Sequence, residues 1–93
     1  MSITIAGTVF DRVRYDAEAD VLYLHAGDPS TASIFDESPE GHSLRFDTNG
    51  DLVGVTIVNA RGLVESRAPI VITIPERVTV DPSALAAAVQ SAA

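Results

Sequence analysis

The chain has 93 residues, with 13 acidic residues against six basic ones, so its formal net charge at pH 7 is −7. It has no cysteine, which excludes disulfides, thiol nucleophiles and cysteine-ligated metals. All six basic residues are arginines, and the absence of lysine excludes a P-loop and Schiff-base chemistry. Arginine-only usage also favours a bacterial origin.

Hydrophobic residues make up 46% of the chain and charged residues 20%, which is typical of a globular domain. No apolar run approaches the roughly 20 residues of a membrane span. The apolar stretch near the N-terminus is too short for a signal peptide and has no basic residue before it. We therefore expect a cytoplasmic protein without a membrane partner.

The first half of the chain begins with strand patterns. Residues 3–5 alternate apolar and polar side chains, and 12–15 do the same. Residues 21–24 are apolar throughout, which predicts a central strand joined to 12–15 as a hairpin. Tyr15 and Tyr23 are expected to form an aromatic cross-strand pair.

The middle of the chain is dominated by turn signals. A weaker strand over 32–36 ends at the turn residues 38–41. Asn49 and Gly50 predict a two-residue type I′ hairpin turn, because both can adopt a positive φ.

That turn fixes a register for the hairpin, with Thr48 opposite Asp51, Phe46 opposite Val53 and Leu44 opposite Val55. The register gathers the apolar residues, continued by Ile57, on one face, and leaves Arg45 and Asp47 on the other. Gly54 indicates a bulge or a close approach of strands.

The last third contains one strong strand and a helix. Residues 59–67 predict a loop or one helical turn, 70–74 a strand bracketed by prolines, and 78–80 a final strand. Asp81 and Pro82 are typical of the N-cap and first position of a helix, which we expect to end near Gln90. Its narrow apolar stripe consists of Leu85 and Val89. The predicted fold class is α+β, mainly β, with an antiparallel sheet of about five to seven strands and a C-terminal helix.

The strand over 70–74 also bears on the oligomeric state. It carries no charge, so an exposed copy would invite aggregation. The C-terminal helix offers little apolar surface to cover it, and two-fold dimers are the commonest oligomers. We therefore predict a homodimer; the alternative is a compact monomer with this strand in mid-sheet.

Acidic residues are concentrated in one half of the sequence. Asp11 to Asp51 holds ten of the 13 acidic residues and three of the six arginines, so its net charge is −7 and the rest is neutral. Nucleic acid is a poor partner for that half, because phosphate binding needs clustered cations. A basic protein partner or a divalent cation fits better, and a solvated acidic face is the simplest alternative.

Asp16, Glu18 and Asp20 form the most suggestive acidic motif. An EF-hand counted from Asp16 would need glycine at position six and glutamate at position twelve, where the chain has Val21 and Gly27. The loop is therefore interpreted as a hairpin connection in which Asp16 caps backbone N–H groups, and as a candidate partner-binding loop. We expect no metal site, no cofactor and no catalytic residues.

The two histidines offer no recognisable site. His25 ends an apolar strand and His42 follows a glycine, without the spacing of a zinc pair. Both are expected to be exposed polar residues.

The segment from Tyr15 to Tyr23 resembles the opening Y-D-x-E-x-D-x-L-Y motif of the bacterial family known as domain of unknown function 2283. The later parts of the family pattern are similar to 37–41, 47–54 and 57–60. The resemblance covers roughly residues 13–60 and implies a small β-rich fold with no established activity. It suggests an antitoxin-like partner role. The expected organisation is one domain over 1–93, with a family-like core over 13–60 and an added strand and helix over 61–93.

The leading hypothesis for function is a non-enzymatic protein-binding module whose acidic half meets a basic surface. The alternative is a small hydrolase or lyase that uses paired carboxylates, with or without a divalent cation. A third is a structural domain that occurs fused to other proteins.

Overall fold

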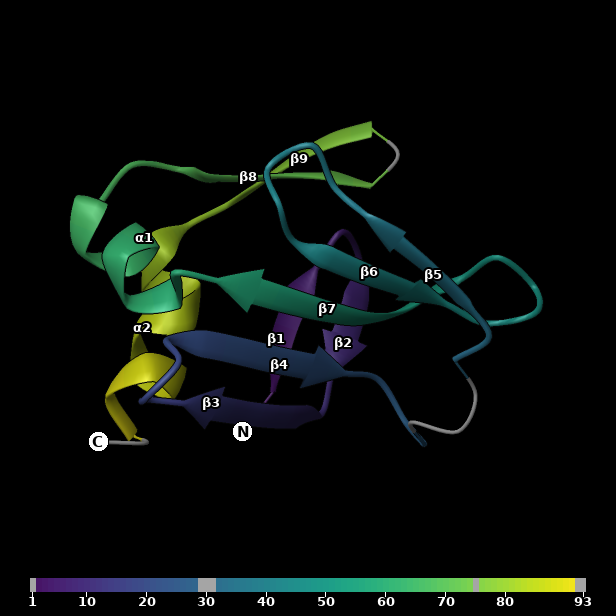
Figure 1. Cartoon of the computed structure of the whole chain (residues 1–93), viewed down its shortest axis with the longest axis horizontal. Helices are drawn as coiled ribbons and strands as arrows, with labels where there is room; N and C mark the ends of the chain where they lie inside the picture. Colours follow the sequence, from purple (N-terminus) through teal and green to yellow (C-terminus); the bar gives the residue numbers. More distant parts are fainter. Residues whose placement is uncertain (1, 29–31, 75, 92–93) are drawn as a thin grey trace.

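The computed structural model describes residues 2–28, 32–74 and 76–91. These residues form nine strands and two helices (Figure 1). In chain order the elements are β1 (Ile3–Ile5), β2 (Thr8–Phe10), β3 (Arg12–Asp16), β4 (Val21–His25), β5 (Ile34–Glu37), β6 (Ser43–Phe46), β7 (Leu52–Val58), α1 (Ala60–Ser66), β8 (Ile70–Ile74), β9 (Glu76–Val80) and α2 (Pro82–Ser91).

Five strands form one antiparallel sheet in the order β3-β4-β7-β6-β5, and the other four form the hairpins β1–β2 and β8–β9. The predicted fold class, mainly β with a C-terminal helix, is confirmed. The first predicted hairpin is present as β3–β4. β4 lies between β3 and β7, so the central strand predicted for 21–24 is also confirmed.

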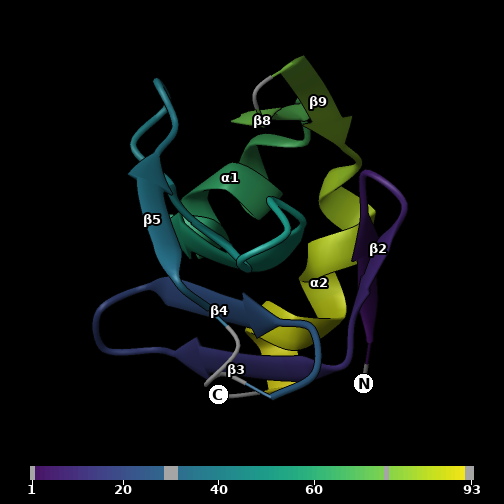
Figure 2. The ribbon, with the colours of Figure 1, turned by 90° about the vertical axis from the view of Figure 1, so that its right-hand side faces the viewer.

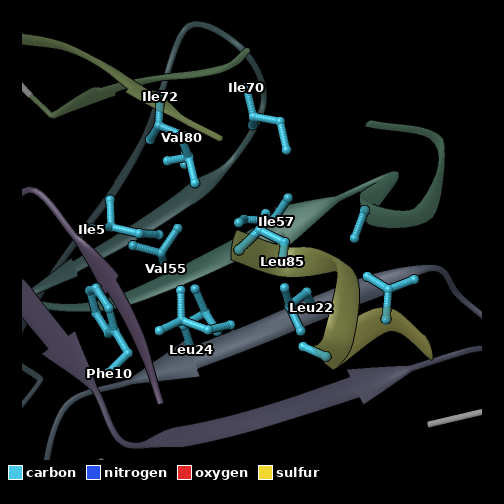
Figure 3. Packing of buried hydrophobic residues seen from close by; sticks show 14 of the residues in the cluster. Ile5, Phe10, Leu22, Leu24, Val55, Ile57, Ile70, Ile72, Val80 and Leu85 are labelled. Atoms are coloured by element: carbon cyan, nitrogen blue, oxygen red, sulfur yellow. The ribbon is translucent and has the colours of Figure 1, made fainter. Parts of the chain in front are cut away.

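One face of the five-stranded sheet, here called the inner face, is covered by α2 and by the two hairpins (Figures 1 and 2). Apolar side chains of β4 and β7 meet side chains from β2, β8 and α2 in a single core (Figure 3). Core residues that are at most 2% exposed include Leu22, Leu24, Val55 and Ile57 from the sheet, with Phe10, Ile72 and Leu85 from the covering elements. Full burial of such a side chain contributes about 1.5–3 kcal/mol.

The opposite face of the same sheet is here called the outer face. Among the described residues no helix or second strand layer packs on it (Figure 2). An antiparallel sheet tolerates this arrangement because alternate side chains can be polar and solvated. The side chains of the outer face are therefore not covered by another layer of the described structure.

The β6–β7 turn corrects one prediction. Gly50 has a φ of +83°, but Asn49 is not among the positive-φ residues, so the turn is not type I′. The loop has three residues, 48–50, because the backbone N–H of Asp47 donates to the carbonyl of Asp51 at 2.9 Å. The carboxylate of Asp47 favours this longer loop, since it accepts the N–H groups of Asn49 and Asp51 at 2.9 and 3.0 Å.

The longer loop shifts the register beside it by one residue. Phe46 pairs with Leu52 and not with Val53, so that pairing was predicted wrongly. A bulge then absorbs Val53, and the predicted pairing of Leu44 with Val55 is confirmed.

The C-terminal third follows most of its sequence signals. Residues 60–66 form a helix of about two turns, longer than the single turn considered above. Asp81 caps α2 as predicted, with its carboxylate accepting the backbone N–H of Ser83 at 3.0 Å. Leu85 and Val89 are buried, which confirms the apolar stripe.

Strand β8 confirms the strand predicted over 70–74, but in its own hairpin and not in the middle of the main sheet. Ile70 and Ile72 are at most 2% exposed and belong to the common core. This apolar face is therefore buried within one chain. The observation from which we predicted a homodimer is thereby removed, and the homodimer itself stays a prediction.

Candidate functional site

The outer face is formed by alternate residues of the five strands, and three rows of cross-strand neighbours cross it, the third being Asp16, Val21 and Val58 on β3, β4 and β7. The first row is Arg12, His25, Gly54, Arg45 and Phe35, each opposite the next on the neighbouring strand. The second row is Arg14, Tyr23, Thr56, Ser43 and Glu37. Three of the six arginines of the chain thus share one face with two aromatic rings and an imidazole.

Two of these arginines stack on aromatic rings. The guanidinium carbon of Arg14 lies 4.5 Å from the centroid of the Tyr23 ring, and that of Arg45 lies 5.6 Å from the centroid of Phe35. A guanidinium held over a ring keeps its N–H groups directed along its own plane, where they remain able to donate. Stacking therefore restricts both side chains without using their hydrogen-bond donors.

A cavity of about 480 Å³ opens on this part of the outer face, and we call it the arginine cavity. Such a volume lies within the range of small-ligand sites. The chemistry-bearing residues that line it are Arg12, Arg14, Tyr23, His25, Arg45 and Thr56.

His25 lies in the wall of the arginine cavity and is only 8% exposed. Neither of its ring nitrogens has a hydrogen-bond partner among the described residues. Buried polar atoms are normally satisfied, so this imidazole is an exception that calls for an explanation. The expectation that His25 is exposed is wrong, because Gly54 on the neighbouring strand β7 has no side chain and leaves space for the imidazole ring against the sheet.

That neighbouring strand contributes Gly54, which is directly opposite His25. A Cβ on Gly54 would lie 3.2 Å from the Cδ2 atom of His25 and 3.2 Å from the Cβ atom of Arg45. The predicted close approach at Gly54 is confirmed, beside the bulge at Val53. The missing side chain leaves room for the imidazole and for the stem of the arginine.

Acidic groups lie at the margins of this face. Asp11 lines the arginine cavity, and its carboxylate accepts the backbone N–H of Gly27 at 3.0 Å. That hydrogen bond lowers the pKa of Asp11, so the group is ionised at neutral pH. Glu37 ends the second row at the β5 edge. Asp16 shares this face with Arg12 and Arg14 on β3, so the face as a whole carries as many carboxylates as these arginines. The lining of the cavity holds three arginines and one carboxylate residue, Asp11, so the cavity itself is locally basic on an acidic protein.

The acidic loop between β3 and β4 has a largely internal role. The carboxylate of Asp16 accepts the backbone N–H groups of Glu18 and Ala19, each at 3.1 Å, as expected for a capping residue. Asp20 accepts the hydroxyl of Tyr15 at 2.6 Å and the backbone N–H of Arg61 at 2.7 Å. Asp16 and Asp20 thus hold the loop and helix α1, whereas Glu18 points to solvent.

Asp20 replaces the cap that α1 lacks. Asn59 precedes this helix in a left-handed conformation, and its side chain makes no capping hydrogen bond. Partial burial would raise the pKa of Asp20, but the hydroxyl of Tyr15, the first N–H groups of α1 and the Arg61 charge outweigh it. The net effect lowers the pKa of Asp20 and keeps it charged at the N-terminus of the helix.

Tyr15 and Tyr23 do not form the expected pair. Tyr15 is opposite Leu22, whereas Tyr23 is opposite Arg14, so the two rings lie on different faces of the sheet. The hydrogen bond to Asp20 raises the pKa of Tyr15. Tyr15 therefore serves the α1 anchor and Tyr23 serves the outer face.

A second polar cluster surrounds the β5–β6 turn. The two carboxylate oxygens of Glu40 accept the backbone N–H and the hydroxyl of Thr73 in β8, at 2.9 and 2.8 Å. These bonds lower the pKa of Glu40, the hydroxyl of Thr73 being the main cause. The hydroxyl of Ser38 accepts the backbone N–H of His42 at 3.1 Å. Glu40 thereby ties the main sheet to the β8–β9 hairpin.

His42 is 3% exposed, which again contradicts the expectation of an exposed histidine. Its Nδ1 atom accepts the backbone N–H of Val58 at 3.3 Å, so the ring carries its proton on Nε2. Burial lowers the pKa of His42 although Glu40 acts in the opposite direction. The ring is bonded to backbone and not to the Ser38 hydroxyl, so these contacts are those of a turn and not of a nucleophile with its base.

The described part of the chain contains no group of three or more His, Cys, Asp or Glu side chains arranged to hold a metal ion. Neither of its helices has the length and apolar character needed to cross a membrane.

Residues 12–61 match the model of the family described as Protein of unknown function (DUF2283). The chain belongs to this family. No curated protein and no solved structure gives a significant match. The DUF2283 segment runs from the first residue of β3 to the start of α1, so it holds the five-stranded sheet, the outer face and the Asp20–Arg61 contact. The hairpins β1–β2 and β8–β9 and the whole of α2 lie outside it.

The arginine cavity was not foreseen from the sequence. One signal was available, because Arg12 and Arg14 are two residues apart on a predicted strand and must share a face. The pairing of β6 with β7 then brings Arg45 to the same face. The net charge of −7 over Asp11 to Asp51 conceals this cluster of arginines, because most of the acidic residues in that segment lie in loops and not on the strands.

Proposed function

We propose that this DUF2283 domain is a non-enzymatic protein-binding module and that the outer face of its five-stranded sheet is the binding surface. The observation that carries the proposal is the composition of this uncovered face. Arginine and aromatic residues are enriched at protein interfaces and among the residues that dominate binding energy. Here three arginines, Tyr23 and Phe35 lie together, and Phe35 is 67% exposed.

The outer face has a stronger case than the acidic loop. Two of the three loop carboxylates already accept hydrogen bonds within the chain, which leaves Glu18 as the free charge. An antitoxin-like role would be one form of such binding. The carboxylate-based hydrolase or lyase receives less support, because the described carboxylates serve turns, caps and strand contacts.

The test is site-specific photo-crosslinking in cells of the source organism. A photoreactive amino acid at Val58, which lies on the outer face and is 39% exposed, should give a discrete crosslinked protein. The matched control is the same amino acid at Val9, which is 55% exposed on the separate β1–β2 hairpin. Equal product patterns from the two positions, or no product from Val58, would contradict the proposal.

We also propose that the homodimer forms through strand β5. This strand is an edge of the main sheet, and all four of its residues are exposed, Ile34 by 50%. Exposed edge strands with apolar side chains are templates for pairing with a second copy. Antiparallel pairing of two β5 strands would be two-fold symmetric and would join the two outer faces.

Sedimentation velocity over a dilution series tests the dimer. We expect twice the 9.8 kDa chain mass at the higher concentrations. Ile34→Glu, which adds a third negative charge to this edge strand beside Asp36 and Glu37, should give monomer, whereas Val9→Glu should remain dimeric. A wild-type chain that sediments as a monomer throughout refutes this arrangement.

A further inference from the structure

The arginine cavity contains a polar group that the fold does not use. His25 is more than nine-tenths buried, and neither of its ring nitrogens, both closed to solvent, has a hydrogen-bond partner among the described residues. An apolar ring of similar shape would fill the same space beside Gly54 without leaving unsatisfied polar atoms. An unsatisfied imidazole in a cavity wall is instead suited to a ligand that displaces the side chains over the ring and completes its hydrogen bonds.

The arginines that surround His25 indicate the charge of that ligand. Arg14 and Arg45 are restrained by their aromatic partners, so less side-chain freedom is lost when they bind an anion. Arg12 is opposite His25 in the same row, and Thr56 adds a hydroxyl. Planar guanidinium groups match the geometry of a carboxylate, which accepts two parallel hydrogen bonds from each.

The surroundings of the cavity favour a short acidic segment over a long polyanion. Asp11 and Glu37 limit the basic area to the cavity itself, and the net charge of the chain is −7. A nucleic acid strand would extend past these margins and meet repulsion along its length. A protein segment can direct one or two carboxylates inward and leave the margins uncharged.

We propose that the outer face binds an acidic segment of its partner protein and that a glutamate or aspartate side chain enters the arginine cavity. There its carboxylate binds Arg14 and Arg45 and accepts a hydrogen bond from His25. This inference rests on the proposed function, because it names the chemistry of the segment that the outer face binds.

The experiment is fluorescence polarisation with a labelled peptide of alternating glutamate and glycine. The matched probe has glutamine in place of glutamate, and single-stranded oligouridine and inorganic phosphate are tested alongside. We expect the glutamate peptide to bind more tightly than the other three, and its affinity to fall with added salt.

Variants of the chain assign the binding to the cavity. The double variant Arg14→Gln with Arg45→Gln should weaken the glutamate peptide at least about tenfold, since charge-assisted hydrogen bonds are lost. The control Arg67→Gln changes an exposed arginine at the end of α1 and should leave binding unchanged.

His25→Phe gives a readout that a purely structural role would not produce. It should weaken peptide binding several-fold, while the melting temperature stays equal or rises because two unsatisfied nitrogens are removed. A lower melting temperature with unchanged peptide affinity would show that His25 serves the fold, and would remove it from the proposed site.

Several outcomes overturn the inference. These are equal binding of the glutamine peptide, tighter binding of oligouridine or phosphate, and equal losses in the double variant and the Arg67→Gln control. If the Val58 crosslink forms while the glutamate peptide fails to bind, the outer face still binds a protein but its segment is not acidic. If both fail, the proposed function fails as well.

Discussion

The two faces of the five-stranded sheet are built from the same strands but follow different rules. Leu24 and His25 are adjacent in β4, and both are buried. Leu24 points to the inner face, where it packs in the core, whereas His25 points to the outer face and has no polar partner in the part of the chain that the structure describes. The inner-face side chains are apolar and packed in the core. The outer face holds the ring nitrogens of His25, which are buried and have no hydrogen-bond partner among the described residues. Such a contrast separates residues that stabilise the domain from residues available for binding.

Substitutions at two neighbouring residues of β7, one on each face, should differ most in their effect on stability. Ile57→Ala removes a fully buried side chain from the inner face and should lower the free energy of unfolding by about 2–5 kcal/mol. Thr56→Ala changes the outer face and should alter it by no more than about 0.5 kcal/mol. Urea denaturation of both variants measures the difference. Similar losses would mean that the outer face also carries the fold.

The next effect concerns the contact between the acidic loop and α1. Asp20→Ala removes the cap of this helix and should lower the free energy of unfolding by about 1–2 kcal/mol. Asp20→Asn is the matched control, because asparagine keeps an acceptor and tolerates the φ of +56° at this position.

The pH dependence of the Asp20 contribution has a defined sign. The pKa of Asp20 in the folded chain lies below its ordinary value of 3.8, so its stabilisation is present above that pH. It is lost as the pH falls through the lower, folded value. Chemical denaturation at neutral pH and in acid should therefore show the gap between wild type and Asp20→Ala closing on acidification.

A smaller effect is expected within the outer face itself. Arg14→Gln removes the stacking on Tyr23 and should lower the free energy of unfolding by about 0.5–1 kcal/mol. Replacing Arg14 should therefore have little effect on stability, although it should weaken binding at the proposed site. A loss as large as that of Ile57→Ala would show that Arg14 is part of the stabilising structure.

A modest pH effect on stability is expected from the buried His42. Burial lowers the pKa of His42 below 6.5, so the unfolded chain binds a proton before the folded chain does. Stability should therefore decrease as the pH falls below 6.5, until the folded state is protonated as well. His42→Asn, whose amide oxygen can accept the N–H of Val58, should reduce this slope in melting temperature.

Local signals in the sequence predicted the inner face well, because alternation in β7 and the apolar run of β4 depend on burial alone. They predicted the cap at Asp81 for a similar reason, since a cap involves only its own turn of helix. The β6–β7 loop differed because the carboxylate of Asp47 stabilises a three-residue turn, which the Asn-Gly pair also allows.

The candidate site was harder to predict because it depends on pairing between distant strands. Arg12 and Arg45 come together only through β4 and β7, and segment charge suggested the opposite sign for this surface. Likewise, the sequence around Asp20 does not indicate its role at helix α1, because that role depends on a hydrogen bond from the backbone N–H of Arg61, 41 positions away. The burial of His25 depends on Gly54, which no pattern in the neighbourhood of His25 reveals.

The tie between Glu40 and Thr73 has a consequence for the order of folding. It joins positions 33 apart, and the bond between Asp20 and Arg61 spans a still longer stretch. Contacts of such sequence separation form late, because the intervening chain must first be brought together. The β3–β4 hairpin closes over a short loop and can form early, whereas the β8–β9 hairpin gains its anchor only after the β5–β6 turn exists. The C-terminal third should consequently be the last part to acquire protection from amide hydrogen exchange during refolding.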